Sequence, residues 1–207
     1  MQQTPQAYLV VDASPSGPAP AELAKVLQFG YVSCVLLQPS SGAVASDARL
    51  AALVKAVQSQ DVAALILGDV NLAVALAADG VHLAFEADPD LAESQFKAAR
   101  TALGSGSIVG AGSGFSRHNA MMLAENGADY VAFGDGPGSS GSERLDLVSW
   151  WAETFVVPCV AWGAANAAEA RQLAGAGADF VAAGPQGGLA AAAATLASLT
   201  APEEAAS

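Results

Sequence analysis

The sequence is poor in positive charge. Of its 207 residues, eight are Lys or Arg and 20 are Asp or Glu, which gives a formal net charge of −12. Non-specific binding to nucleic acid depends on neutralising phosphates with basic side chains, so we expect no nucleic-acid partner. A phosphorylated small ligand would have to be bound by backbone N–H groups, a metal ion or the few cations present.

The sequence also lacks a membrane-spanning segment and an export signal. The longest uncharged run, residues 180–202, is mostly alanine and is interrupted by Gly184, Pro185 and further glycines, which is not typical of a transmembrane helix. Residues 1–6 are polar and uncharged, unlike the start of a signal peptide. We therefore expect a cytoplasmic protein without a membrane partner.

Cysteine is scarce, with two in the chain. Cys34 and Cys159 both fall within short apolar segments, which places them in the expected core. A buried, reduced thiol is the ordinary role of such a cysteine, and a ligand or nucleophile is the alternative.

An internal repeat is the main organising pattern. The pair Ala-Asp, followed by Gly or an aromatic residue and then Val, begins at Ala78, Ala128 and Ala178, so the acids are 50 residues apart. A period of this size indicates repeated structural units. Each unit divides into two strand-plus-helix pairs of about 25 residues, which predicts eight such pairs in the chain.

The expected strands are short and continuously apolar, as strands are when both faces of a parallel sheet are buried. They span residues 7–12, 32–37, 63–68, 80–84, 107–111, 129–134, 157–162 and 179–184. Helix-like stretches include residues 20–29, 46–60, 71–78, 118–126 and 166–175. Eight alternating pairs predict an α/β fold, a single-domain (β/α)8 TIM barrel over residues 1–207. Residues from about 190 to 207 are expected to form the last helix and a disordered tail.

An open, doubly wound sheet is the alternative α/β architecture. Its phosphate-binding loop after the first strand reads Gly-x-Gly-x-x-Gly. Residues 13–17 read Ala-Ser-Pro-Ser-Gly, which does not fit that pattern, so the barrel is favoured.

Two glycine-containing loops mark the expected ligand-binding end of the barrel. Ligands of such barrels bind at the loops after the strand C-termini, and phosphate often binds after the seventh and eighth strands. Those loops begin here with Gly163-Ala164 and Gly184-Pro185, and each leads into a helix. Their N–H groups can bind phosphate, although glycines of this kind also form simple turns.

Other polar and aromatic residues are placed by their position along a strand. Asp12 ends the first strand and faces the same mouth, whereas Asp129 and Asp179 begin strands at the opposite face, where a stabilising role is expected. His82 lies within a strand and is expected to be a hydrogen-bonded core residue. Trp162 ends the seventh strand and can either form a pocket wall or pack in the core.

The loop after the fifth strand contains two basic side chains. Ser116 is expected to cap a helix whose first turn holds Arg117 and His118. Because a helix N-terminus disfavours positive charge, both are candidates for binding an anion at the catalytic mouth. The alternative is that Arg117 pairs with Asp88, Glu86 or Asp135 across the mouth, and that His118 is an ordinary surface residue.

Several segments, in this order, resemble the thiamine phosphate synthase and thiazole tautomerase family. They read Leu-Ile-Leu-Gly-Asp at 65–69, Gly-Val-His-Leu at 80–83, Gly-Ala-Asp-Tyr-Val-Ala-Phe-Gly at 127–134 and Val-Ala-Trp-Gly at 160–163. The resemblance runs over most of the chain and implies a phosphate-binding TIM barrel. Synthases of this family join hydroxymethylpyrimidine diphosphate to thiazole phosphate, release pyrophosphate and use Mg²⁺.

The resemblance also implies roles for individual residues. Asp69 would bind Mg²⁺, and Glu86 or Asp88 would be the second ligand if the loop after the fourth strand is shifted. The loops that begin at Gly163 and Gly184 would bind the thiazole phosphate of a phosphorylated heteroaromatic ligand. The candidates for substrate and phosphate binding are Asp12, Gln38, Ser113, Ser139, Arg144, Trp162, Gly163, Ala164, Gly184 and Pro185.

The chain departs from the family pattern where the family carries positive charge. Residues 36–40 read Leu-Leu-Gln-Pro-Ser in place of a block with Arg and Lys, and residues 135–142 contain no Lys in place of a lysine-bearing loop. Each charge-assisted contact to a diphosphate contributes about 1.5 to 3 kcal/mol, so these losses bear on the ordinary mechanism.

Two hypotheses follow. In the first, the protein is a divergent synthase-type enzyme in which Arg117 and Arg144 replace the missing cations. In the second, it is a non-catalytic or tautomerase-like relative that keeps the thiazole-phosphate site and has lost the diphosphate site. A scaffold without ligand is weaker, because the two glycine loops would then only turn the chain. The sequence leaves open whether the protein is catalytically active and whether it forms a homo-oligomer.

Overall fold

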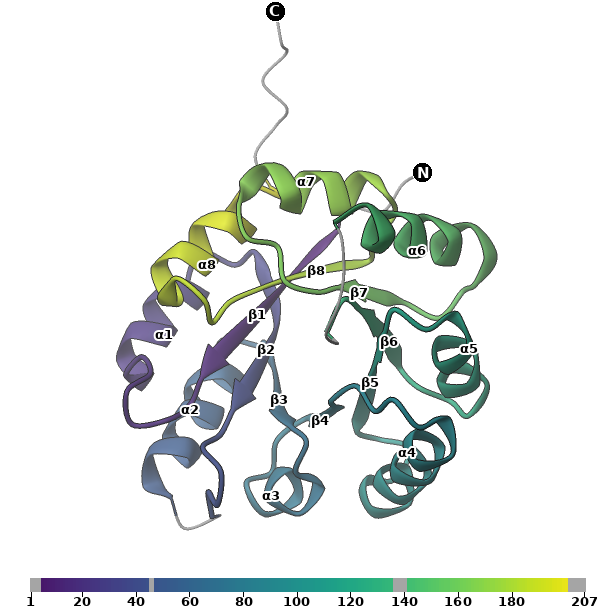
Figure 1. Ribbon diagram of the computed structural model, residues 1–207. Coiled ribbons are helices and arrows are strands. Elements are labelled where there is room, and N and C mark those ends of the chain that lie inside the picture. The colour runs from purple at the N-terminus through teal and green to yellow at the C-terminus, as the bar shows by residue number, and fades with distance from the viewer. Residues whose placement is uncertain (1–4, 45–46, 136–140, 201–207) are drawn as a thin grey trace, which may run out of the picture.

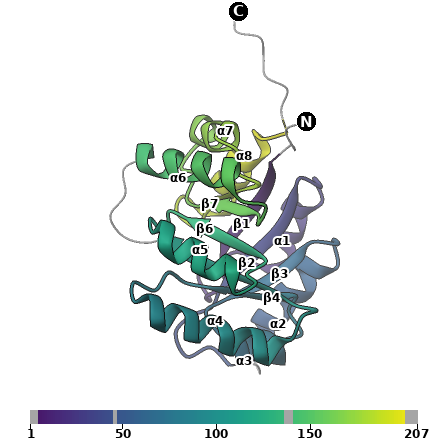
Figure 2. The ribbon, with the colours of Figure 1, turned by 90° about the vertical axis from the view of Figure 1, so that its right-hand side faces the viewer.

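The computed structural model describes residues 5–44, 47–135 and 141–200. Strands and helices alternate along the chain, and eight parallel strands close into a barrel in chain order. Figure 1 shows the helices as a ring around the strands, and Figure 2 shows the same layers from the side. The expected (β/α)8 TIM barrel is confirmed.

The elements lie close to their expected bounds. The strands are β1 (Gln6–Asp12), β2 (Val32–Gln38), β3 (Ala63–Leu67), β4 (Gly80–Leu83), β5 (Ile108–Gly114), β6 (Tyr130–Phe133), β7 (Cys159–Ala161) and β8 (Phe180–Ala183). The helices are α1 (Pro20–Leu27), α2 (Ala48–Gln58), α3 (Val70–Ala75), α4 (Pro89–Leu103), α5 (Arg117–Glu125), α6 (Gly141–Thr154), α7 (Ala167–Gly175) and α8 (Gly188–Ala197). Helix α3 ends earlier than expected because Ala77 adopts a φ of +51°, which a right-handed helix cannot contain. The expected disordered tail falls largely on residues 201–207, outside the described part.

The outer core, between the strands and the helices, divides into two clusters of buried apolar side chains. The first cluster lies under α1, α2 and α3 and also contains Ala192 and Leu196 from α8. The second lies under α4 to α7, with Phe96, Phe133 and Trp151 as its largest members. Figure 1 shows α8 beside α1, so the first cluster joins both ends of the chain.

Side chains fill the inside of the barrel. Tyr8, Leu36, Leu65, Tyr130 and Val160 belong to one buried interior cluster, so the barrel has no open channel through these layers. The hydroxyl oxygens of Tyr8 and Tyr130 lie 2.9 Å apart and form a hydrogen bond.

Both cysteines are free and buried, in agreement with the simpler expectation. Burial raises the pKa of the Cys34 thiol, and it raises the pKa of the Cys159 thiol to about 12. Both thiols therefore stay protonated at neutral pH, which does not favour a ligand or nucleophile.

Within the described residues, no helix has both the length and the apolar character needed to cross a membrane.

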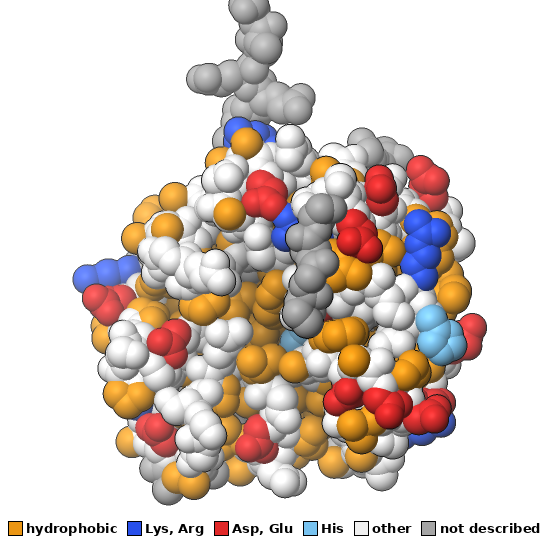
Figure 3. Space-filling view, in the orientation of Figure 1, with side chains coloured by type: hydrophobic (Ala, Val, Ile, Leu, Met, Phe, Trp, Pro, Cys, Tyr) orange, Lys and Arg blue, Asp and Glu red, His pale blue; other side chains and the backbone are white. Residues whose placement is uncertain are grey.

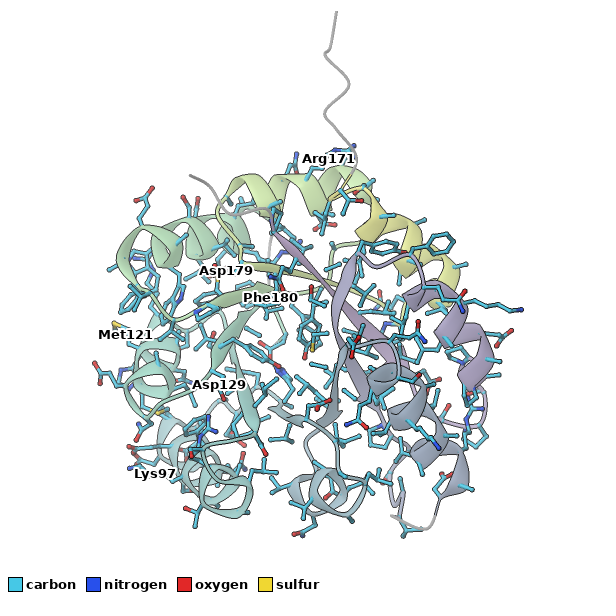
Figure 4. All side chains as sticks on the ribbon, turned by 180° about the vertical axis from the view of Figure 1, so that it is seen from behind. Lys97, Met121, Asp129, Arg171, Asp179 and Phe180 are labelled. Carbon is cyan, nitrogen blue, oxygen red and sulfur yellow. The ribbon has the colours of Figure 1, made fainter. Side chains whose placement is uncertain are left out.

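The repeated aspartates connect neighbouring strands at the end of the barrel where the strands begin. Oδ2 of Asp79, Asp129 and Asp179 accepts a hydrogen bond from the N–H of Ala64, Val109 and Cys159, at 2.7, 2.7 and 2.8 Å respectively. Figure 4 shows Asp129 and Asp179 near the starts of their strands, at the face opposite the one in Figure 1. The 50-residue period therefore reflects a structural role, as predicted for these acids.

Replacing Asp129 with alanine is expected to lower the free energy of unfolding by about 1 to 3 kcal/mol, because the buried N–H of Val109 loses its partner. The substitution also removes the ion pair with Arg100. Urea-induced unfolding measures the change. Asp146→Ala, at an exposed position of α6, is the control and is expected to change stability by less than about 0.5 kcal/mol. Equal effects of the two substitutions would contradict the assigned role.

Candidate functional site

A pocket of about 570 Å³ opens at the C-terminal ends of β1, β2 and β8. Asp12, Gln38 and Pro185 line it, so the structure brings together three of the residues predicted to bind substrate. The remaining lining residues are Val10, Val11, Ser16, Gly17, Pro18, Glu22, Gln186, Gly188 and Leu189. Figure 3 shows apolar side chains in the middle of the face seen in Figure 1, with acidic side chains spread around them.

The N-terminus of α8 lies at this pocket. The helix begins at Gly188, directly after Gly187, and no side chain caps it. Side chains do cap α2, α3, α4, α5 and α7, through Asp47, Asp69, Asp88, Ser116 and Asn166. The N–H of Gly188 donates to the Pro185 carbonyl at 2.9 Å, and both Gly188 and Leu189 of this first turn line the pocket. Such a helix start can bind an anion.

The pocket wall next to β1 is fixed by Arg49 of α2, a residue that was not predicted. Its Nε donates to the Ser14 carbonyl at 3.1 Å, and its Nη2 donates to the carbonyls of Gly17 and Pro18 at 2.8 and 2.7 Å. Hydrogen bonds from Ser14 lower the pKa of Asp12, and the charge of Arg49 adds to this effect. Asp12 is therefore an ionised carboxylate at the pocket.

Two N–H groups of the loop after β7 donate hydrogen bonds to other groups of the protein. The N–H of Ala164 donates to the Ala182 carbonyl, and the N–H of Ala165 donates to Oε2 of Glu169, both at 2.9 Å. The carbonyl of Gly163 accepts from Arg144. Of the two loops predicted to bind phosphate, the one after β8 is therefore the better placed.

Arg144 is buried and joins three parts of the structure. Its Nη1 donates to the carbonyls of Trp162 and Gly163, and its Nη2 pairs with Oε1 of Glu169. Its Nε has no partner within the described residues. Contact of Arg144 with a phosphate stays a prediction, because its Nη1 and Nη2 already donate to the loop after β7 and to Glu169.

Arg144→Met is expected to lower the free energy of unfolding by about 2 to 3 kcal/mol, because Oε1 of Glu169 and the Trp162 carbonyl lose their donor and the charge of Glu169 is no longer balanced. Adding Glu169→Gln should recover about 1 kcal/mol by removing the unpaired carboxylate. Urea titrations of both variants test this, with Arg171→Met at an exposed position of α7 as the control. No recovery in the double variant would contradict the pairing.

The two basic residues at the start of α5 are exposed. The guanidinium carbon of Arg117 lies 4.5 Å from the centre of the Trp150 ring in α6, and among the described residues no carboxylate forms an ion pair with it. Ser116 caps the helix as predicted, by accepting from the N–H of Asn119 at 3.1 Å. Catalytic roles for Arg117 and His118 stay predictions.

The carboxylates expected to bind Mg²⁺ serve as helix caps. Asp69 accepts from the N–H of Leu72 at 2.8 Å, and Asp88 accepts from the N–H of Asp90 at 3.0 Å. Among residues 5–44, 47–135 and 141–200, no three His, Cys, Asp or Glu side chains gather in a way that could hold a metal ion. These residues therefore do not fit a metal site held by the protein alone.

A polar group of residues lies below the mouth, inside the barrel. His82 is 1% exposed, its Nδ1 lies 2.9 Å from the Tyr130 hydroxyl, and its ring stacks on Trp162 with centroids 5.0 Å apart. His82 is thus a hydrogen-bonded core residue, as expected, and burial lowers its pKa to about 3. Trp162 is partly buried, which is compatible with both of its predicted roles.

Asp135 belongs to the same group, although the sequence indicated it only as a possible partner of Arg117. Its Oδ1 accepts from the N–H of Gly114 at 2.9 Å, and its Oδ2 has no hydrogen-bond partner within the described residues. Burial raises the pKa of Asp135 to about 6. An Asp just after a strand in a Gly-rich loop was the available signal, but loop acids of this kind are mostly exposed.

Two remaining candidates are less informative. The hydroxyl of Ser113 is buried and donates to the Ala132 carbonyl at 2.8 Å, at the bulge near the end of β5. Ser139 lies outside the described residues, so its predicted contact with substrate is not described.

Comparison with known proteins gives consistent results. The family model described as thiamine monophosphate synthase matches residues 7–185. A thiamine-phosphate synthase from Rhodospirillum centenum is 36% identical over 166 residues, which covers 77% of each chain. Another from Erythrobacter litoralis is 34% identical over 187 residues, covering 86% of this chain and 85% of that protein.

Solved structures resemble the chain in fold. Thiamine phosphate pyrophosphorylase from Pyrococcus furiosus has a TM-score of 0.72 at 21% identity and covers 96% of this chain and 95% of its own. The (S)-3-O-geranylgeranylglyceryl phosphate synthase from Thermoplasma acidophilum has a TM-score of 0.67 at 17% identity, covering 95% and 94%. At these identities the likeness concerns the fold alone.

Proposed function

The chain belongs to the thiamine monophosphate synthase family, and from that premise we propose that it is a divergent synthase-type enzyme of thiamine biosynthesis. The reaction joins hydroxymethylpyrimidine diphosphate to thiazole phosphate. The bond between the pyrimidine methylene carbon and the diphosphate oxygen breaks, pyrophosphate leaves, and the thiazole nitrogen forms a new bond to that carbon.

The observation that carries the proposal is the pocket in which Asp12, Gln38 and Pro185 meet the uncapped start of α8. The N–H groups of α8 would bind the phosphate of the thiazole, which suits a chain with few cations. Asp12 is ionised and would repel a phosphate, so it is suited to a neutral or cationic part of the ligand. Trp162, at the mouth end of β7, offers an aromatic surface for a ring.

A second candidate function is a non-catalytic or tautomerase-like relative that binds thiazole phosphate. This candidate is favoured because three arginines already have partners within the protein. Arg144 donates to the loop after β7, Arg49 donates to the loop after β1, and Arg117 contacts the Trp150 ring. In this conformation these three would have to leave their partners to balance a diphosphate. Neither proposal includes a step on Mg²⁺, and Asp69 and Asp88 serve as helix caps.

Calorimetric titration tests the two candidates. The protein is titrated with thiazole phosphate, then with the pyrimidine diphosphate in the presence of Mg²⁺, and the mixture is assayed for thiamine phosphate. Product formation supports the synthase. Binding of thiazole phosphate without diphosphate binding or product supports the second candidate, and binding of neither ligand would contradict both.

A further inference from the structure

The charges of helix α5 are arranged against the helix dipole. Arg117 lies in the first turn, where the dipole is positive, and Glu125 is the last residue, where the dipole is negative. Helices α1 and α4 have the usual order, with an acid in the first turn and a base in the last. For an isolated helix the order in α5 is unfavourable at both ends.

Neither charge is balanced by the part of the chain that the structure describes. Among residues 5–44, 47–135 and 141–200, no carboxylate forms an ion pair with Arg117 and no cation forms one with Glu125. Both side chains are exposed, and Arg117 lies over the ring of Trp150 in α6. A group that balances both ends of α5 therefore has to belong to another molecule.

The surface of α5 between the two charges is apolar. Arg117, Met121 and Glu125 are four residues apart and form one row along the helix. Met121 is partly exposed, and Figure 4 shows it at the outer edge of the molecule. Met122 and Trp150 are also partly exposed and widen this surface. Figure 2 looks onto this side of the barrel, where α5 lies between α4 and α6. Arg, Met and Trp are enriched at protein interfaces, so the row has the composition of one.

We propose that α5, together with Trp150 of α6, is the surface through which two copies of this chain form a dimer, with the two-fold axis at Met121. A two-fold axis perpendicular to α5 makes the two helices antiparallel. Arg117 and Glu125 each lie four residues from Met121, so Arg117 of one copy faces Glu125 of the other on both sides of the axis. The two Met121 side chains pack together at the centre.

A second copy fits this surface better than an unrelated partner. The row reads positive, apolar, negative, and its antiparallel copy supplies the complementary order without any further requirement. Each charge also reaches the end of the opposite helix that favours it. Glu125 of one copy lies beside the N-terminus of the other α5, and Arg117 lies beside its C-terminus.

Analytical ultracentrifugation of the full chain at about 1 to 100 µM tests the proposal. At the higher concentrations we expect the wild type to have twice the 20.5 kDa mass of one chain. Met121→Lys should weaken association at least about tenfold, because two like charges then meet at the axis. Gln172→Lys adds the same charge at an exposed position of α7 and is the matched control, with an expected change of less than about twofold.

Charge reversal tests the pairing itself. Glu125→Arg should weaken association about tenfold, because it places two arginines opposite each other. Adding Arg117→Glu restores opposite charges across the axis and should return the affinity to within about threefold of the wild type. The double variant also agrees with the helix dipole, so it is expected to fold, and circular dichroism checks this for every variant.

Three results would overturn the inference. They are a wild type that stays monomeric over the whole concentration range, equal effects of Met121→Lys and Gln172→Lys, and no recovery in the double variant. If Met121→Lys does not fold, Glu125→Arg at its exposed position replaces it in the comparison with the control. The readout is mass rather than turnover, so the result is independent of the proposed function.

Discussion

Replacing Gly184 with alanine should lower the free energy of unfolding by about 3 to 5 kcal/mol. Gly184 adopts a φ of +103°, which side chains rarely adopt. An added Cβ would overlap the Val10 carbonyl oxygen and lie 3.3 Å from Cβ of Ala192. Neither neighbour can withdraw without moving β1 or α8.

The same change should weaken ligand binding. Gly184 precedes Pro185, which lines the pocket, so a shift of this segment moves the start of α8 away from β1. Urea unfolding and a thiazole phosphate titration measure the two effects. Gly175→Ala is the matched control, because an added Cβ meets nothing within 4 Å there and helix α7 should gain up to about 1 kcal/mol. A Gly184→Ala protein as stable as the control would contradict the packing described.

The stability of Asp135→Asn relative to the wild type should improve by about 2 to 3 kcal/mol between about pH 4 and pH 7. Burial raises the pKa of Asp135 from 3.8 to about 6, so the folded state prefers the protonated acid. The wild type therefore carries little penalty from this group below about pH 4. The penalty grows as the pH rises to about 6 and is constant above it, because an ionised carboxylate is then buried. Asparagine does not ionise, so the Asp135→Asn protein does not carry this penalty.

His82 changes the pH dependence of stability in the opposite direction. It is present in both the wild type and Asp135→Asn. Burial lowers its pKa to about 3, so its contribution to stability is complete above pH 6.5 and is lost as the pH falls towards 3. Comparing the two proteins at each pH cancels this contribution. Urea titrations at several pH values measure the difference, and a difference independent of pH would contradict burial of an ionisable Asp135.

The fold could be predicted because its signals are local or periodic. Short apolar runs mark strands buried on both faces, and the 50-residue spacing of Asp79, Asp129 and Asp179 follows from a repeated contact between neighbouring strands. Errors occurred at ends that depend on backbone detail. Strand β5 continues to Gly114 rather than residue 111, past a bulge that apolar pattern alone does not reveal.

The site could be predicted only in part. Asp12, Gln38 and Pro185 line one pocket, because strand ends and barrel topology determine which loops meet, and their contact with substrate stays a prediction. Arg49 and the buried position of Asp135 were missed, since their importance comes from partners far away in the chain, such as Ser14 or His82. Conversely, the sequence could not show that the donors of Arg144 are already used.

The position of α8 in the first apolar cluster has a consequence for synthesis of the chain. During translation β1 to α3 emerge from the ribosome first. The first apolar cluster, to which they belong, lacks Ala192 and Leu196 until α8 emerges. Most of the second cluster, from Val81 to Val181, is complete before that point. The earliest part of the protein is therefore the last to finish its core, and a nascent chain stopped before α8 would expose apolar surface to chaperones.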